Sequence, residues 1–299
     1  MERREFIKLN TTGFMGLALA SIAPPLLMSS CEKDLFFKIS LAQWSLHRTL
    51  KSGELDTLNF PAKAKNDFNI NAVEYVNSFF FDKANNKNYL SDLLLRTNDL
   101  NVENVLIMVD GEGHLGETKQ LDRSKTVEKH YKWVEAAQHL GCHSIRVNAS
   151  GDGSETEVAK HAEESLFQLA TFAKDYKINV IVENHGSYSS MADWLIPIIK
   201  NVNLENCGTL PDFGNFYKYD RYQGVKEMMP FAKGVSAKTN SFTTNGTEST
   251  IDYTKMLQIV KNSNYSGYIG IEYEGPNDNE DLGIQKTKDL LLKIGNELS

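Results

Sequence analysis

Three acidic side chains each lie at the end of a short apolar run, where they could hold a metal ion or move protons. Glu183 ends the run 178–183 (INVIVE), Asp212 directly follows the run 206–211, and Glu272 lies near the end of 267–273 (GYIGIEY). Carboxylates that share one place repel each other, and a divalent cation relieves that repulsion because it prefers hard oxygen ligands. Each acid alone could equally cap a helix or form a surface ion pair. The same placement in three runs favours a shared site.

The elements that must position these acids alternate along the chain, because each apolar run typical of a buried strand is followed by a stretch with helical spacing. We expect strands at 36–46, 72–76, 102–109, 143–148, 178–183, 206–211, 234–238 and 267–273, and helices at 54–68, 89–100, 122–140, 155–176, 191–202, 224–230, 250–262 and 280–298. Eight such units predict an α/β fold with parallel strands inside and helices outside. At this length they fit a single (β/α)8 TIM barrel over residues 36–298. An open doubly wound sheet is the alternative, but no G-x-G-x-x-G pattern follows the first strand.

In a barrel of this kind, reactive side chains lie where the strands end. Further polar and aromatic residues fall at these positions and are expected at the same mouth: Trp44, Glu74, Asp110, Asn148, His185 and Lys238. A charged side chain that points into a barrel must be paired or bind a metal, because burying it alone is costly. Trp44 could instead pack outside the first strand.

Four segments together resemble the xylose isomerase-like TIM-barrel family, also called sugar phosphate isomerase/epimerases. They are SIRVN (144–148), VIVENHG (180–186), LPDFGNF (210–216) and GYIGIEYEG (267–275), and the resemblance covers roughly residues 36–297. The resemblance implies a divalent metal ion (Mn, Mg, Zn or Co), held by Glu, Asp, His and Glu from successive strands. Carried over, Glu183, Asp212 and Glu272 are the first, second and fourth ligands. No nucleotide cofactor is expected.

The third ligand departs from the family pattern, because GVSAK (234–238) places Ser236 where the family has His. Serine is a poor neutral ligand. Either water completes the coordination shell, or His185 or Asn215 substitutes, or metal binding is weakened or lost. Lys238 could also replace part of the cation's charge with its ammonium group.

The resemblance implies a carbohydrate isomerase or epimerase with Glu183 and Glu272 as its catalytic pair. One glutamate would remove a proton beside a sugar carbonyl to give an enediolate, and the other would return a proton from the opposite face. The residues expected to bind the sugar are His185, Lys238, Asn148, Glu74 and Trp44. Because no Gly-rich phosphate cradle is visible, an unphosphorylated or keto sugar is expected. A keto-glycoside lyase or hydrolase using the same site and a non-catalytic carbohydrate-binding lipoprotein remain alternatives.

Residues 1–30 have the order of an export signal: Arg3 and Arg4, then the apolar stretch 14–27, then small residues before Cys31. RREFIK resembles a twin-arginine signal, and MSSC resembles a lipoprotein cleavage box. Cys31 would then carry the lipid and residues 31–35 would form a tether, which makes the mature protein a periplasmic or cell-envelope lipoprotein. A membrane anchor or a first core helix is the alternative.

Composition limits the partners of this protein. The 299 residues include 32 Lys and Arg against 39 Asp and Glu, for a net charge of −7, whereas nucleic-acid binding favours a basic face. Three cysteines are too few for a disulfide scaffold, and Cys142 and Cys207 are expected to be buried free thiols. The expected partners are therefore a small carbohydrate and, through the N-terminal lipid alone, a membrane, with an oligomer possible.

Overall fold

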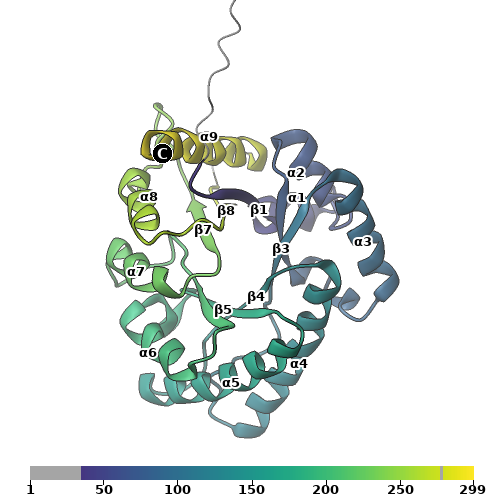
Figure 1. Cartoon of the computed structure of the whole chain (residues 1–299), viewed down its shortest axis with the longest axis vertical. Coiled ribbons are helices and arrows are strands. Elements are labelled where there is room, and N and C mark those ends of the chain that lie inside the picture. Colours follow the sequence, from purple (N-terminus) through teal and green to yellow (C-terminus); the bar gives the residue numbers. More distant parts are fainter. Residues whose placement is uncertain (1–34, 277–278) are drawn as a thin grey trace, which may run out of the picture. The chain divides into compact units, whose positions relative to one another are not determined.

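Eight parallel strands form the centre of the computed structural model, which describes residues 35–276 and 279–299. The predicted export signal and Cys31 lie outside the described residues. The hydrogen-bonded order is β6-β5-β4-β3-β2-β1-β8-β7, and Figure 1 shows the strands as a ring. The strands are β1 (Lys38–Ala42), β2 (Ala72–Val76), β3 (Glu103–Met108), β4 (Ser144–Val147), β5 (Asn179–Glu183), β6 (Cys207–Leu210), β7 (Val235–Thr239) and β8 (Tyr268–Tyr273). The predicted (β/α)8 TIM barrel is confirmed.

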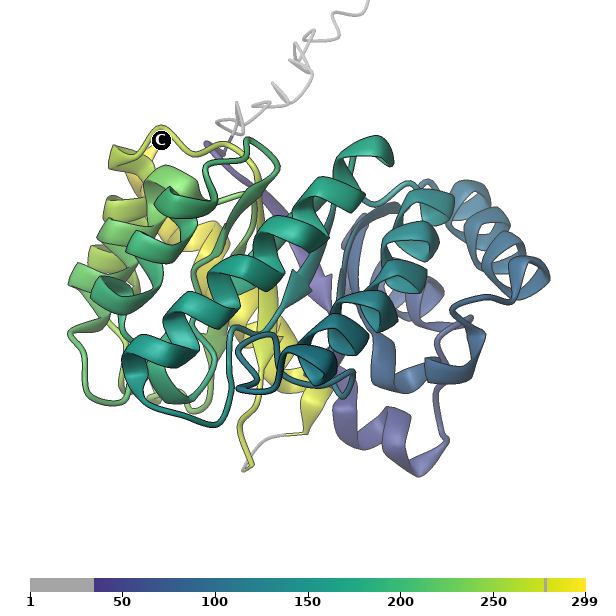
Figure 2. The same ribbon diagram turned by 90° about the horizontal axis from the view of Figure 1, so that it is seen from below.

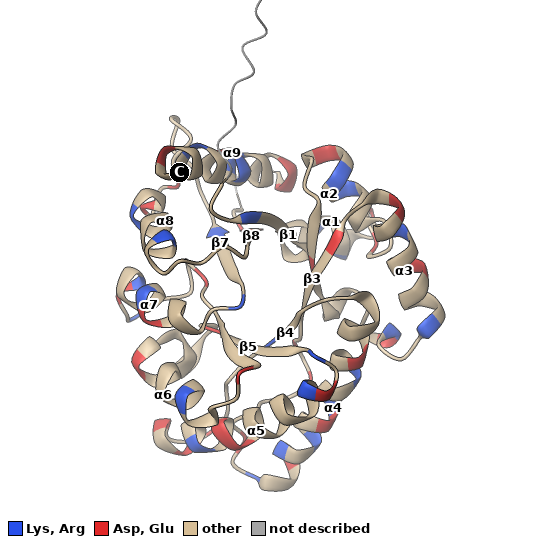
Figure 3. Cartoon of the chain, viewed as in Figure 1, with Lys and Arg blue, Asp and Glu red and all other residues tan. Residues whose placement is uncertain are grey.

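Helices between the strands cover the outside of this ring, as Figures 1 and 2 show. They are α1 (His47–Ser52), α2 (Phe60–Phe68), α3 (Lys87–Leu100), α4 (Gln120–Leu140), α5 (Glu155–Asp175), α6 (Ala192–Val202), α7 (Arg221–Met228), α8 (Tyr253–Asn262) and α9 (Glu280–Leu298). Figure 3 shows charges of both signs distributed over these helices, with a smaller number on the strands inside. Among the described residues, no helix is both long enough and apolar enough to cross a membrane.

The ring closes between β6 and β7 through isolated bridges and not through a full strand ladder. Asp212 and Ser236 pair across this seam, as do Thr209 and Ala232. The backbone N–H of Ser236 donates to Pro211 O (2.9 Å), and that of Phe213 donates to Ser236 O (3.1 Å). The seam therefore passes through Asp212, one of the three predicted ligands.

Alternating side chains along each strand divide the core into an inner and an outer part. On β2, Val73 and Tyr75 belong to the large core shared with the helices, whereas Ala72 and Val76 belong to a small separate core inside the ring. The same alternation on β5 places Ile181 inside. Residues two positions away from these inner side chains therefore face the barrel interior, and the polar residues of the mouth occupy such positions.

Two predicted boundaries differ from the structure near the N-terminal end of the barrel. The first strand stops at Ala42 because side chains replace its ladder: Gln43 Oε1 accepts from Val76 N (2.9 Å), and Ser45 Oγ donates to Ile271 O (2.9 Å). The helix expected from residue 54 begins only at Phe60. Pro61 lies in its first turn, where the missing N–H has no helical partner to lose.

Candidate active site

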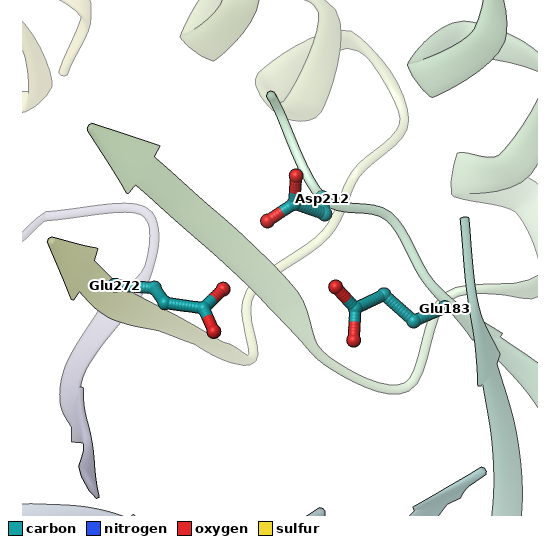
Figure 4. Close-up of side chains that lie close together, drawn as sticks. All are labelled: Glu183, Asp212 and Glu272. Atoms are coloured by element: carbon teal, nitrogen blue, oxygen red, sulfur yellow. The ribbon is translucent and has the colours of Figure 1, made fainter. Parts of the chain in front are cut away.

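Three buried carboxylates meet inside the mouth of the barrel. Glu183 ends β5, Asp212 lies two residues beyond β6, and Glu272 lies near the end of β8. One oxygen from each lies within 4.8 Å of the others, and Figure 4 shows the three groups pointing toward one another. The structure therefore brings together the three residues predicted to share a site.

Asp212 is fixed by the loop that follows β6. The Asn184 side chain brackets the Asp212 backbone, accepting from its N–H (2.7 Å) and donating to its carbonyl (3.0 Å). Asp212 Oδ1 accepts from the backbone N–H groups of Gly214 (2.8 Å) and Asn215 (2.7 Å). A side chain at Gly214 would collide with Lys238, because a Cβ there would lie 2.8 Å from its Cδ. This glycine thus lets Lys238 reach the acids.

Glu183 is held from two sides, but one of its oxygens has no aligned hydrogen bond. Asn215 Nδ2 donates to Glu183 Oε1 (2.9 Å), so Asn215 orients a predicted ligand. Arg146 Nε lies 2.8 Å from Glu183 Oε2, close enough for an ion pair. The N–H of Arg146 Nε does not point at this oxygen, since neither Arg146 Nε nor Glu183 Oε2 makes a hydrogen bond of acceptable geometry. Glu183 Oε2 is therefore buried beside a charge but free to accept a ligand.

Ser236 and Lys238 lie between the other two acids. Ser236 Oγ is 2.7 Å from both Asp212 Oδ2 and Glu272 Oε2. Lys238 Nζ lies 3.8 Å from Asp212 Oδ2, 3.6 Å from Glu272 Oε2 and 3.2 Å from Glu274 Oε2. Because a hydroxyl has one hydrogen to donate, the two short contacts of Ser236 require a second proton on one of the carboxyl groups.

The pKa values of the three acids show where that proton is held. Burial, strengthened by the charges of Glu272 and Glu183, raises the pKa of Asp212 to about 8. Burial also raises the pKa of Glu183 to about 7, although Arg146 opposes the shift. Burial acts on Glu272 too, but Lys238, Ser236 and Arg146 together hold its pKa below the ordinary value. Of the two acids that Ser236 contacts, Asp212 is therefore the one whose surroundings favour the protonated form.

These residues fit a divalent cation. The cluster holds three carboxylates, one free oxygen (Glu183 Oε2) and a proton that a cation would displace. Among the described residues, neither His nor Cys joins the group, so its protein donors are all oxygen atoms. An all-oxygen donor set is typical of sites for Mg²⁺ and Mn²⁺.

A cavity of about 380 Å³ opens beside the acids. Its lining consists of Trp44, Lys51, Val76, Ser78, Asp110, Arg146, His185, Glu272 and Glu274. Glu272 is the member of the acid cluster that reaches this space. Trp44 Nε1 donates to Glu274 Oε1 (2.5 Å), and the Lys51 ammonium lies 4.6 Å from the centre of the Trp44 ring. Trp44 therefore lines the cavity and does not pack outside the first strand.

The other residues predicted to bind sugar take different positions. His185 lines the cavity, and burial together with the Arg146 charge lowers its pKa. Lys238 lies among the acids, as described above. Asn148 reaches the cavity through a partner, because its Nδ2 donates to Asp110 Oδ1 (2.7 Å).

Glu74 lies deeper in the barrel and does not line the cavity. Ser40 Oγ donates to Glu74 Oε1 (2.5 Å), and Gly270 leaves room for the carboxyl group, since a Cβ there would lie 2.5 Å from the same oxygen. Glu74 Oε2 is buried without a hydrogen-bond partner. Burial raises the pKa of Glu74 to about 8, so the group is neutral at pH 7.

The sequence prediction missed Lys51, Val76 and Ser78 of the cavity lining and two charged residues that contact the predicted site, Arg146 and Glu274. Both of these charged residues line the cavity. A signal was present, because side chains two residues apart on a strand share a face. Arg146 precedes Asn148 by two residues and Glu274 follows Glu272 by two.

Comparison with solved structures shows the same fold in other proteins. The IOLI protein with a bound zinc atom superposes with a TM-score of 0.68 at 13% identity, covering 87% of this chain and 99% of that one. D-psicose 3-epimerase from Clostridium cellulolyticum H10, solved with D-tagatose, gives 0.70 at 11% identity, with coverage of 86% and 99%. A xylose isomerase-like TIM barrel protein from Mycobacterium smegmatis in complex with magnesium gives 0.66 at 11% identity, with coverage of 87% and 97%.

Comparisons at the level of sequence give one result for individual proteins and another for families. No curated protein sequence matches this chain. The family model described as "Xylose isomerase-like TIM barrel" matches residues 63–294, which is more than half of the chain. The chain therefore belongs to the xylose isomerase-like TIM barrel family.

Proposed function

We propose that this protein is a carbohydrate isomerase or epimerase that moves a proton at the carbon beside a sugar carbonyl. The observation that carries the proposal is the placement of Glu272. This glutamate belongs to the buried acid cluster and also lines the cavity, so a ligand in the cavity would touch a group able to take a proton. Family membership and the fold shared with sugar epimerases support the same reaction class.

The two glutamates have the proton affinities that such a transfer needs. The pKa of Glu272 is lowered by Lys238 and Ser236 against the effect of burial, so this group is an ionised base at neutral pH. The pKa of Glu183, raised by burial to about 7, lets that group hold or release a proton near neutrality. Proton transfer is most efficient when the pKa of the acid or base lies near the working pH. We assign Glu272, which lines the cavity, as the group that removes the proton; Glu183 shares the acid cluster with it but does not line the cavity, and is the candidate for the group that returns one.

A divalent metal ion completes the proposed site, with Glu183, Asp212 and Glu272 as its protein ligands. When bound, a metal ion would polarise the sugar carbonyl and stabilise negative charge on its oxygen. Ser236 would orient Asp212 and Glu272, and Asn215 would orient Glu183. The all-oxygen donors favour Mg²⁺ or Mn²⁺ as the physiological ion, with Zn²⁺ and Co²⁺ as the other candidates.

The proposed substrate is an unphosphorylated or keto sugar. The cavity volume of about 380 Å³ lies at the small end of ligand pockets, which suits a monosaccharide unit. Trp44 offers an aromatic surface, and Asp110, His185 and Glu274 offer polar groups for sugar hydroxyls. D-Tagatose in the Clostridium cellulolyticum structure is a free ketose of this size.

We also propose that the protein is exported and anchored through a lipid on Cys31, on the support of the N-terminal sequence alone. Metabolic labelling with a fatty-acid analogue tests this proposal. The wild-type protein should incorporate the label and a Cys31→Ser variant should not. Equal labelling of the two would remove Cys31 as the attachment point.

The reaction is tested by solvent exchange. Purified protein is incubated in D₂O with free ketoses and 3-keto sugars, and deuterium at the carbon beside the carbonyl is measured by mass spectrometry. We expect exchange by the wild type and a loss of about 10²–10⁴-fold in Glu183→Gln and Glu272→Gln. Glu280→Gln is the matched control, because Glu280 is a buried acid outside the cavity.

The products separate the alternatives. An epimer or isomer supports the proposal, whereas release of the aglycone from a 3-keto glycoside identifies a lyase at the same site. Absence of exchange by the wild type on the whole panel contradicts the proposed reaction. Sugar binding without exchange and without a stoichiometric divalent metal would identify a non-catalytic carbohydrate-binding protein.

A further inference from the structure

We propose that Arg146 is a catalytic residue of this site, whose guanidinium group holds the sugar carbonyl oxygen and stabilises the negative charge that forms there. This inference rests on the proposed function. It assigns an electrophilic role to Arg146, which lies in the segment 144–148 but belongs neither to the acid cluster nor to the site residues that the resemblance implies.

The position of Arg146 combines deep burial with access to a ligand. The residue lies on the inner face of β4, and its side chain is only 5% exposed. It nevertheless lines the cavity, together with Asp110 and His185. A guanidinium so far removed from bulk water interacts with a developing charge much more strongly than a surface arginine does.

Fixed partners hold the Arg146 side chain in place before any ligand arrives. Nη1 donates to Asp110 Oδ1 (2.7 Å), and Nε lies 2.8 Å from Glu183 Oε2. Asn148 Nδ2 donates to the same Asp110 oxygen (2.7 Å), and the Asn77 side chain brackets the Asp110 backbone with two contacts of 2.9 Å. A donor that is oriented in advance needs no reorganisation when charge develops, which is the condition for strong electrostatic catalysis.

The Arg146 guanidinium also has N–H groups that form no hydrogen bond with the described residues. Arginine carries five N–H groups. Within residues 35–276 and 279–299, Nη2 forms no hydrogen bond, and Nε forms none of acceptable geometry despite its closeness to Glu183. Nε is buried against Glu183, whereas Nη2 is not among the buried atoms, so Nη2 is the donor available to an oxygen atom of a sugar bound in the cavity.

The chemical step balances with Arg146 as a donor that keeps its proton. The Glu272 carboxylate takes the proton from the carbon, the C–H electron pair forms the new C=C bond, and the carbonyl π electrons move to oxygen as negative charge. Return of a proton to carbon reverses these movements. Because arginine does not lose its proton in proteins, the group remains a cation throughout.

A purely structural role would be to neutralise Asp110 and Glu183. The test therefore separates the loss of a structural cation from the loss of an oxygen-binding donor. Arg146→Ala leaves a space that free guanidinium at millimolar concentration can enter, whereas Arg146→Lys keeps the charge but loses the planar fork. Arg123→Ala is the matched control, because Arg123 is also a buried arginine paired with a glutamate (3.0 Å to Glu164) but lies on α4, outside the cavity.

Solvent deuterium exchange, divalent-metal content and thermal unfolding are measured for all variants. We expect Arg146→Ala to fold and retain metal while exchanging about 10²–10³-fold more slowly, with partial recovery in guanidinium. Arg146→Lys should lose at least about tenfold and gain nothing from guanidinium. Arg123→Ala should exchange at the wild-type rate.

Several outcomes would overturn this assignment. Exchange by Arg146→Ala or Arg146→Lys at the wild-type rate rejects it and leaves the proposed function intact. Loss of metal or of the fold in both Arg146 variants makes the residue structural and also rejects it. If the wild type itself shows no exchange, the proposed function fails and the role of Arg146 fails with it.

Discussion

Buried carboxylates occur in two kinds of surroundings in this barrel. Glu280, at the start of α9, accepts from the backbone N–H groups of Arg48 (2.7 Å) and Thr49 (3.0 Å) and from the Thr49 hydroxyl (2.6 Å), and its Oε1 also lies 3.7 Å from Arg48 Nε. At the mouth, Glu183 and Glu272 face other acids and are neutralised by long cationic side chains. A buried acid surrounded by backbone donors joins segments of the chain. Acids that face each other repel, and this repulsion favours the binding of protons or cations at the mouth.

The largest expected effect concerns Glu74, a buried acid with one oxygen that has no hydrogen-bond partner. Because burial raises its folded-state pKa to about 8 from an ordinary 4.5, its contribution to stability is present below pH 4.5 and is lost as the pH rises to 8. Relative to the wild type, Glu74→Gln should gain about 4 kcal/mol in unfolding free energy over this interval. Urea unfolding at several pH values, in the presence of a chelator, measures the difference. If the unfolding free energies of the two proteins change with pH in parallel, the pKa of Glu74 is not raised in the folded protein and the prediction is wrong.

An intermediate effect is expected from metal ions. A ligand that binds only the folded protein at one hundred times its Kd raises the unfolding free energy by about 2.7 kcal/mol. Mn²⁺ or Mg²⁺ at that level should stabilise the wild type by this amount and should not stabilise Asp212→Asn. Thermal unfolding with and without the ion measures the shift. An equal rise in the unfolding temperature of Asp212→Asn would show that the cation binds elsewhere in the molecule.

The smallest effect is expected at the opposite kind of acid. Glu280→Gln replaces a charged acceptor of two backbone N–H groups with an amide, so we expect a loss of about 2 kcal/mol in unfolding free energy. Stabilisation of this variant by Mn²⁺ should equal that of the wild type. Denaturant unfolding with and without the ion provides both values. Loss of the metal effect in this variant would abolish the distinction between the two kinds of acid.

Strand periodicity was enough to predict the barrel and the three acids of its mouth. Glu183 and Glu272 end apolar runs, and Asp212 follows one, so their convergence follows from the parallel order of the strands. The departure at Ser236 was also visible in the sequence. Its consequence was not, because the two short contacts of its hydroxyl depend on the closure of the ring between β6 and β7.

The depth of a side chain within the barrel was the part that the sequence could not supply. Glu74 and Arg146 both face inward, yet Glu74 is covered and Arg146 lines the cavity. Periodicity determines which face a residue occupies, whereas depth depends on the tilt and stagger of neighbouring strands. Asn148 was predicted to lie at the mouth from its place at the end of a strand, but its hydrogen bond to Asp110 could be seen only in the three-dimensional structure.

The seam between β6 and β7 is where we expect the barrel to open locally most often. The other neighbouring strands are joined by ladders, whereas this junction relies on isolated bridges, one of them between Asp212 and Ser236. Local unfolding begins where cooperative pairing is weakest, so amide hydrogens at the seam should exchange with solvent before those of β4 or β5. Glu183 and Asp212 lie on one side of that junction and Glu272 lies on the other, so a ligand bound by all three would connect the two sides. Binding of such a ligand should therefore slow local opening of the ring between β6 and β7.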